Sequence, residues 1–298
     1  MRAAPDFAAL AAGLSTAARV QFATTAAERV GGGCINECFR WQSSEGPCFV
    51  KLAEPGRLSM FEAESDGLRE LGAAKAVRVP RALASGRTAT HAFLVLEWIE
   101  RGRAHPSSEA VLGKRLAAQH RTTTREFGWH RDNTIGLTPQ LNGRSTDWVE
   151  FFGERRLRFQ LDLAARNGFG RLLAVRGERL LGALPALLDG HEPLPSLLHG
   201  DLWGGNWFAD AAGEPVIFDP AVYYGDREAD LAMTRLFGGF GDTFHAAYEA
   251  AWPLDSGHVE RRELYNLYHV LNHANLFGGR YASEAAAMID RLVARAAA

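Results

Sequence analysis

Hydrophobic and polar positions follow two different rhythms along this chain. In the first hundred residues, short runs such as CFRWQ, PCFVKLA and HAFLVLEWI are rich in β-branched and aromatic residues, which predicts strands. One helix interrupts them. It is predicted to begin near Ser59 and carries an apolar stripe at Phe61, Leu68 and Leu71. The Ala-rich stretch FAALAAGLSTAA predicts a further amphipathic helix before the strands.

Beyond residue 107 the spacing becomes helical. Apolar residues recur every three or four positions, for example at Trp148, Phe151, Phe152 and Phe159. Helices are predicted over residues 108–121, 147–167, 171–188, 260–275 and 282–297. The change of rhythm predicts an α+β, bilobal protein: an N-terminal β-sheet lobe with one key helix over residues 1–103, and a larger, mainly helical lobe over 104–298.

Composition narrows the class of protein only broadly. The 298 residues are 47% hydrophobic and 23% charged, and the net charge of −2 gives no reason to expect binding to nucleic acid or to an anionic membrane. No apolar run reaches the roughly 18 residues of a membrane span. Three cysteines, Cys34, Cys38 and Cys48, match no zinc spacing, so a reduced, cytoplasmic setting is expected. Oligomeric state is not readable from the sequence.

Two charged residues lie where the pattern predicts burial. Lys51 is in the middle of the strand FVKLA, and Glu64 lies on the helix stripe, three residues after Phe61. A buried charge without a partner costs several kcal/mol, so an ion pair between the two explains both positions. The alternative is two unrelated surface charges whose stems lie along the protein. Glu62 and Asp66 lie off the stripe and are expected to be solvated.

A glycine-rich turn, GGGC, precedes the second strand. Glycines at Gly31, Gly32 and Gly33 allow backbone N–H groups to approach phosphate oxygens closely, although no GK[ST] signature follows. Gly-rich hairpin turns are common, so this signal is weak alone. Cys34 is expected at the tip of the turn, where its thiol is either inert or sensitive to oxidation.

The segment LLHGDLWGGNWFADAAGEPVIFDP is the most informative. Two apolar runs end in polar clusters, and the turn residues between them predict a hairpin that places Asn206 beside Asp219. Amide and carboxylate oxygens suit Mg²⁺. Asp201, on the preceding loop, is then available to take a proton from an attacking hydroxyl. His199 is interpreted as a brace for the loop backbone. The alternative is a surface hairpin with Asx turns.

HGDxxxxN followed by IFDP is the catalytic-loop and metal-loop pattern of the protein-kinase-like phosphotransferases. Four further segments narrow the resemblance: DPAVYYGDREADLAM, LFGGF, LYHVLNHANLFGG and FGWHRDNTIGLTPQLN. With them, the chain resembles the fructosamine-3-kinase, or ketosamine-3-kinase, family over residues 18–290. The resemblance implies a protein-kinase-like fold, ATP and Mg²⁺, and transfer of the γ-phosphate to the sugar 3-hydroxyl of ketoamines. Fructosamines, ribulosamines and erythrulosamines, on free amines or on protein lysines, are the implied substrates, and deglycation is the implied role.

The resemblance also assigns roles to residues. Asp201 is the implied catalytic base, and Asn206 and Asp219 are the implied Mg²⁺ ligands. Lys51, paired with Glu64, is implied to contact the ATP phosphates. The residues implied to surround the nucleotide are Gly31, Gly32, Gly33 and Cys34 over the phosphates, and Glu97, Trp98 and Ile99 at the adenine hinge. The acceptor side is expected to include His130, Asp132, Asn133 and Trp203, for which loop capping or packing is the alternative.

Three departures from the family pattern are Gln119, Arg144 and Asp226. None belongs to the phosphoryl-transfer set, but Arg144 leaves the sugar preference open.

An aminoglycoside kinase should show an acidic patch, which is not obvious here. A choline-type kinase needs an aromatic cage, for which Trp148, Trp203, Tyr223 and Tyr224 are the candidates. A non-catalytic nucleotide-binding module is the third alternative, although no expected catalytic group is missing.

Overall fold

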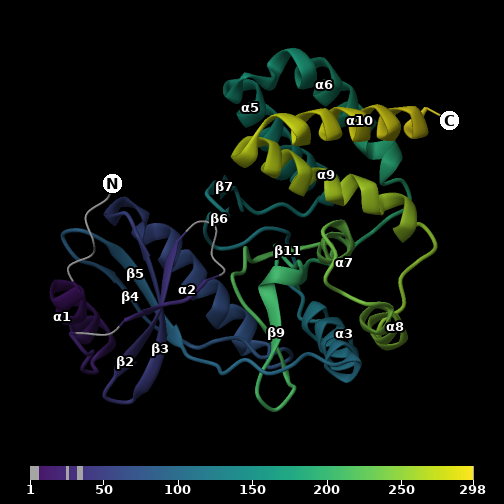
Figure 1. Ribbon diagram of the computed structural model, residues 1–298. Coiled ribbons are helices and arrows are strands. Elements are labelled where there is room, and N and C mark those ends of the chain that lie inside the picture. The colour runs from purple at the N-terminus through teal and green to yellow at the C-terminus, as the bar shows by residue number, and fades with distance from the viewer. Residues whose placement is uncertain (1–6, 25–26, 32–35, 298) are drawn as a thin grey trace.

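The computed structural model describes residues 7–24, 27–31 and 36–297 (Figure 1). Its N-terminal part contains a five-stranded antiparallel sheet in the order β1-β2-β3-β5-β4. The strands are β1 (Glu28–Arg29), β2 (Glu37–Ser43), β3 (Gly46–Ala53), β4 (Ala82–Arg87) and β5 (Ala92–Glu97). The sequence pattern predicted β2, β3 and β5; β4, of sequence ALASGR, has too little apolar character to be recognised.

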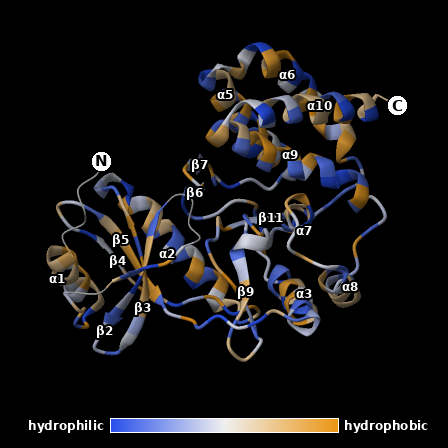
Figure 2. Ribbon diagram, viewed as in Figure 1, coloured by the Kyte–Doolittle hydropathy of each residue, from blue (hydrophilic) through white to orange (hydrophobic). Residues whose placement is uncertain are grey.

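Each face of this sheet is covered by one helix. Helix α1 (Phe7–Ala18) packs against Val50, Leu52 and their neighbours on one face. Helix α2 (Leu58–Ala73), with a short 3₁₀ turn at Pro55–Arg57 before it, packs on the other. Because successive side chains of a strand point to opposite faces, Lys51 points toward α2. Figure 2 shows the hydrophobic middle of the sheet between the two helices.

The rest of the chain is mainly helical, as the sequence predicts. It contains α3 (Pro106–His120), α4 (Trp148–Phe151), α5 (Phe159–Ala164), α6 (Gly170–Leu187), α7 (Arg227–Leu236), α8 (Asp242–Ala251), α9 (His258–Phe277) and α10 (Gly279–Ala296). Wider π-helical turns at Phe152–Arg158 and Ala165–Phe169 connect α4, α5 and α6. The sequence did not predict α7 and α8. Helix α7 has only ten residues, and its seven buried residues include the charged Glu228 and Asp230, so residue type is a poor guide to its buried side.

Three two-stranded antiparallel sheets in the helical part carry the loops of interest. They pair β6 (Asn133–Ile135) with β7 (Thr138–Gln140), β8 (Ser196–Leu198) with β11 (Tyr223–Gly225), and β9 (Trp207–Ala209) with β10 (Pro215–Ile217). A 3₁₀ turn at Gly204–Asn206 leads into β9. Among the helices that the structure describes, none combines the length and the apolar character needed to cross a membrane.

One buried histidine makes stability depend on pH. His269 on α9 is buried, and burial lowers its pKa to about 3, below the roughly 6.5 of an unfolded chain. Below about pH 6.5 the His269 side chain binds a proton in the unfolded state but not in the folded state. The free energy of unfolding therefore keeps the full contribution of His269 above about pH 6.5, and it falls by about 1.4 kcal/mol for each pH unit below. Urea unfolding at pH 7.5 and 5.5 should show a smaller loss in His269→Leu than in the natural protein. Equal losses would contradict this assignment.

Candidate active site

The predicted pairing of Lys51 with Glu64 is present. The Lys51 Nζ lies 2.6 Å from Glu64 Oε1 and also donates a hydrogen bond to Asp219 Oδ1. Lys51 on β3 and Glu64 on α2 belong to the small lobe, whereas Asp219 follows β10 in the helical part. The lysine therefore joins the two parts of the chain at one point.

Burial and charge oppose one another in this cluster. Burial alone would lower the pKa of Lys51, but the carboxylates of Asp219 and Glu64 outweigh it and raise that pKa, so the ammonium stays charged. Burial raises the pKa of Glu64, and Lys51 acts against this rise. Only 3% of Lys51 is exposed, so removing either acid would leave a charge with incomplete compensation in a place that water hardly reaches.

The predicted hairpin brings the polar ends of its strands together. Trp207 on β9 pairs with Ile217 on β10, and the Phe218 N–H donates to the Asn206 carbonyl at 3.1 Å. Asn206 therefore precedes β9 and Asp219 follows β10, so both residues lie at the same end of this short ladder. The backbone of Asp219 has a φ of +57°, a left-handed conformation that costs about 1–3 kcal/mol in a non-glycine residue and is typical of functional sites.

Asp201 lies next to both of these residues. The Asn206 side-chain nitrogen donates to the Asp201 carbonyl at 2.9 Å and to its Oδ2 at 3.2 Å. Burial, followed by the negative charge of Asp219, raises the pKa of Asp201 to about 7. A carboxyl group with a pKa near neutrality is suited to general-base catalysis.

The loop that carries Asp201 is held from two sides. His199 Nε2 donates to the Phe218 carbonyl at 2.9 Å, and its Nδ1 accepts from the Asp201 N–H at 3.3 Å, which confirms the predicted bracing role. The structure adds Asp230 on α7, which no sequence argument singled out. Its carboxylate accepts from the backbone N–H groups of His199 at 2.7 Å and Gly200 at 2.8 Å. Asp230 is one of two acids in α7, and nothing in the sequence distinguished it from Glu228.

Asp230 is expected to position the catalytic loop without touching a substrate. Asp230→Ala leaves two buried N–H groups unpaired, which should lower the free energy of unfolding by about 2–4 kcal/mol. A displacement of the loop by about 1 Å should lower kcat by about 10²-fold while the KM for ATP changes little. Urea unfolding and steady-state kinetics on the folded variant measure both. A stable variant with normal kcat would contradict this role.

The nucleotide side is described only in part. Gly31 is exposed, and Gly32, Gly33 and Cys34 lie outside the described residues, so their predicted cover over phosphates stays a prediction. Glu97 ends β5 and uses its side chain to pair with Arg78 and Arg81. Trp98 and Ile99 follow at the passage between the two parts of the chain, where the hinge was predicted.

The predicted acceptor loop proves largely structural at Asn133. This buried side chain donates to the Val222 carbonyl at 2.8 Å, and its oxygen accepts from Gln140 and Asn142. Asn133 was predicted to contact the phosphate-accepting substrate. Because its side chain makes its hydrogen bonds within the protein, it instead supports the loop that follows Asp219. Asp132 is exposed and accepts from the Asn142 N–H at 2.7 Å.

His130 and Trp203 are exposed, so both remain available to an acceptor. Asp66, which was expected to be solvated, keeps 31% of its side chain exposed and also takes part in an ion pair. Arg131, beside His130, lies 2.7 Å from its carboxylate. This ion pair ties the predicted acceptor loop to α2, and therefore to the helix that carries Glu64.

The structure contradicts the aromatic cage of a choline-type kinase. Trp148, Tyr223 and Tyr224 are buried in the main core, and only Trp203 of that set is exposed.

Of the departures from the family pattern, Arg144 is exposed and 3.3 Å from Glu126. Gln119 is buried and contributes a 3.5 Å hydrogen bond to the Leu197 carbonyl.

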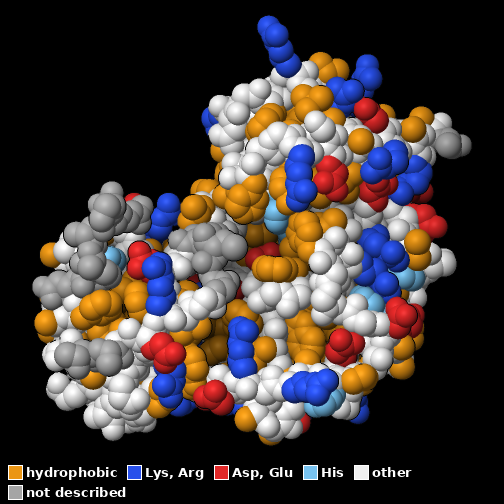
Figure 3. Space-filling model, in the orientation of Figure 1, with side chains coloured by type: hydrophobic (Ala, Val, Ile, Leu, Met, Phe, Trp, Pro, Cys, Tyr) orange, Lys and Arg blue, Asp and Glu red, His pale blue; other side chains and the backbone are white. Residues whose placement is uncertain are grey.

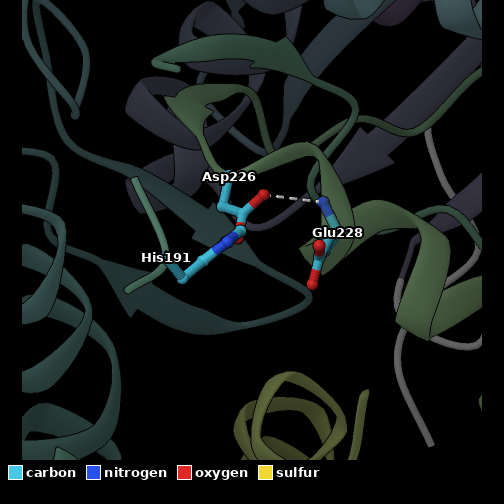
Figure 4. Close-up of side chains that lie close together, drawn as sticks. All are labelled: His191, Asp226 and Glu228. Atoms are coloured by element: carbon cyan, nitrogen blue, oxygen red, sulfur yellow. Dashed lines mark hydrogen bonds and ion pairs between the residues drawn. The ribbon is translucent and has the colours of Figure 1, made fainter. Parts of the chain in front are cut away.

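Asp226 belongs to a second cluster of polar side chains, with His191 and Glu228 (Figure 4). Their potential ligand atoms lie within 4.8 Å of one another, but each already has protein partners. Asp226 Oδ2 accepts from His191 at 2.6 Å and from Tyr265 at 2.5 Å. The Nε and Nη2 groups of Arg261 donate to the two carboxylate oxygens of Glu228. An adjacent guanidinium opposes a cation, so this cluster is a structural network at the start of α7.

Comparison with known proteins agrees with this geometry. The fructosamine kinase family model matches residues 7–295. A probable ketoamine kinase of Synechocystis is 45% identical over 88% of both chains. A chloroplastic protein-ribulosamine 3-kinase of Arabidopsis thaliana is 42% identical over 88% of this chain and 80% of its own.

Solved structures show the same fold. A candidate fructosamine-3-kinase of Haemophilus somnus superposes with a TM-score of 0.87 at 28% identity, covering 95% of this chain and 96% of its own. An aminoglycoside phosphotransferase shares the fold at 15% identity, with a TM-score of 0.59 over 93% of this chain and 96% of its own. The fold is therefore the bilobal, kinase-like α+β fold, and the protein is a phosphotransferase that belongs to the fructosamine kinase family.

Proposed function

We propose that the protein transfers the γ-phosphate of ATP to the sugar 3-hydroxyl of ketosamines, that is, of fructosamine, ribulosamine or erythrulosamine adducts. One observation carries the proposal: Lys51, Asp201, Asn206 and Asp219 converge in a chain that belongs to the fructosamine kinase family. Relatives named ketoamine kinase and protein-ribulosamine 3-kinase support the choice of acceptor. The 3-phosphate destabilises such adducts, so deglycation is the proposed outcome.

The residues fit a magnesium ion between Asn206 and Asp219. Carboxylate and amide oxygens are the ligands that this hard cation takes, together with phosphate oxygens. Since the Asn206 side-chain nitrogen donates to Asp201, its amide oxygen is the atom left for a metal. When bound, Mg²⁺ supplies charge neutralisation at the phosphates. In the proposed complex, Lys51 moves from its contact with Asp219 toward the phosphate oxygens and keeps Glu64.

Asp201 acts as the proposed base. Its carboxylate takes the proton of the sugar 3-hydroxyl while the oxygen forms a bond to the γ-phosphorus. The bond from that phosphorus to the β,γ-bridging oxygen breaks, and ADP leaves. A pKa of about 7 allows Asp201 to accept this proton near neutral pH and to release it afterwards. The braces from His199 and Asp230 hold the carboxylate in place during this transfer.

The experiment is a panel of acceptors with ATP and Mg²⁺. Ribulosamine, erythrulosamine, fructosamine, an aminoglycoside and choline are each assayed for ADP release, and ³¹P NMR locates the phosphate in the product. We expect phosphorylation at O3 of one or more ketosamines and none of the other two acceptors. Phosphorylation of the aminoglycoside or choline alone would replace the proposed function. ATP binding without turnover of any acceptor would favour a nucleotide-binding module.

A further inference from the structure

Aromatic rings are exposed on one part of the helical lobe. Among the residues that the structure describes, three phenylalanines and tryptophans expose more than a third of their surface: Trp203 at 39%, Phe237 at 39% and Phe277 at 61%. Exposing a large aromatic ring forgoes the free energy of burial, so a cluster of such rings indicates a binding surface. Figure 3 shows hydrophobic side chains around a histidine where the helical lobe faces the small lobe.

This surface begins at the loop that carries the proposed base. Gly204, beside Trp203, packs directly on the loop between α7 and α8. A Cβ on Gly204 would lie only 2.7 Å from the Gly239 Cα and 2.9 Å from the Gly238 carbonyl oxygen. Phe237 immediately precedes these two glycines. The absence of side chains at Gly204, Gly238 and Gly239 therefore lets the segments carrying Trp203 and Phe237 come together.

From Phe237 a series of ring contacts continues to α9 and α10. The ring centroids of Phe237 and His273 are 4.6 Å apart, and His273 lies 5.4 Å from Phe277 and 5.2 Å from Tyr281. His273 Nδ1 donates to the His269 carbonyl at 2.8 Å, which fixes the orientation of the imidazole. The rings of this aromatic platform, namely Phe237, His273, Phe277 and Tyr281, thus form one contiguous surface with a fixed centre.

We propose that the aromatic platform binds the amine-side substituent of the ketosamine, and that the protein therefore prefers ketosamines whose amine carries an aromatic or large apolar group. This inference rests on the proposed function. With the sugar 3-hydroxyl at Asp201, Trp203 lies beside the sugar, and the substituent extends over Phe237 toward Phe277. Covering these rings removes apolar surface from water on both sides of the contact and adds ring–ring interactions.

Two ribulosamines that differ only in their amine test the platform. The kcat/KM for N-ribulosyl-phenethylamine is compared with that for N-ribulosyl-methylamine. We expect the natural protein to favour the phenethylamine adduct by about tenfold or more, because a small change in apolar contact gives differences of this size. In Phe277→Ala and Phe237→Ala the ratio of the two values should fall toward 1. Phe277 is largely exposed, so Phe277→Ala should fold normally.

Val259→Ala is the matched control. Val259 is 52% exposed near the opposite end of α9 and should leave both values and their ratio unchanged. A natural protein that phosphorylates both adducts equally would overturn the platform and leave the proposed function intact. A protein that phosphorylates neither would overturn both. A fall in molar mass by light scattering in Phe277→Ala, with the ratio unchanged, would show that the rings join two copies of the chain, and would also overturn the proposal.

Discussion

Replacing Asp201 with asparagine should lower kcat by about 10²–10⁴-fold, because the side chain keeps its shape but no longer accepts a proton. ATP binding should change little, since Asp201 is placed to contact the acceptor rather than the nucleotide. Steady-state turnover of a ribulosamine measures the first effect, and calorimetric titration with ATP in the presence of Mg²⁺ measures the second. Together they separate the loss of a base from the loss of a binding site.

Asp189→Asn is the control for this experiment. Asp189 is an exposed acid just after α6 and should give a variant with normal kcat. If Asp201→Asn retained more than a tenth of the natural kcat, another group would have to accept the proton. If it lost ATP affinity in proportion to kcat, the change would reflect a damaged nucleotide site.

Replacing Asp219 with asparagine should lower kcat/KM for ATP by about 10³-fold. The substitution removes the only formal negative charge among the proposed metal ligands, and charge neutralisation by a bound cation is worth several kcal/mol in phosphoryl transfer. It also removes one of the two carboxylates that hold Lys51 in place. A titration of activity with Mg²⁺ should show that the variant needs a much higher Mg²⁺ concentration than the natural protein.

Asp242→Asn serves as a control here, since Asp242 is an exposed acid at the first position of α8. It should retain both the activity and the Mg²⁺ requirement of the natural protein. An Asp219→Asn variant whose activity stays within tenfold, at an unchanged Mg²⁺ requirement, would exclude Asp219 as a metal ligand.

The phosphoryl-transfer set could be predicted from the sequence because its members violate local rules. Lys51 and Glu64 are charges at buried positions, and their pairing is observed. Turn chemistry between two apolar strands was sufficient to place Asn206 near Asp219. Such conflicts between residue type and position are expected at functional sites and are visible without any structure.

Other features depend on contacts between distant segments. Asp230 looked like one more acid in a helix that the periodicity did not reveal, and its role becomes visible only when α7 lies beside the catalytic loop. The pair between Asp66 and Arg131 joins residues 65 positions apart. Phe237 lies just after α7 and Phe277 ends α9, and nothing in either segment alone predicts that their rings meet at His273.

The central claim is that Asp201, Asn206 and Asp219 of the helical lobe and Lys51 of the small lobe surround one metal–nucleotide complex. A crystal structure with ADP and Mn²⁺, with anomalous diffraction locating the manganese, tests it directly. We predict a single manganese bound by the Asn206 amide oxygen and the Asp219 carboxylate, with Lys51 on the nucleotide phosphates and Asp201 facing open space for the acceptor. Manganese bound elsewhere, or a nucleotide remote from Lys51, would contradict the account.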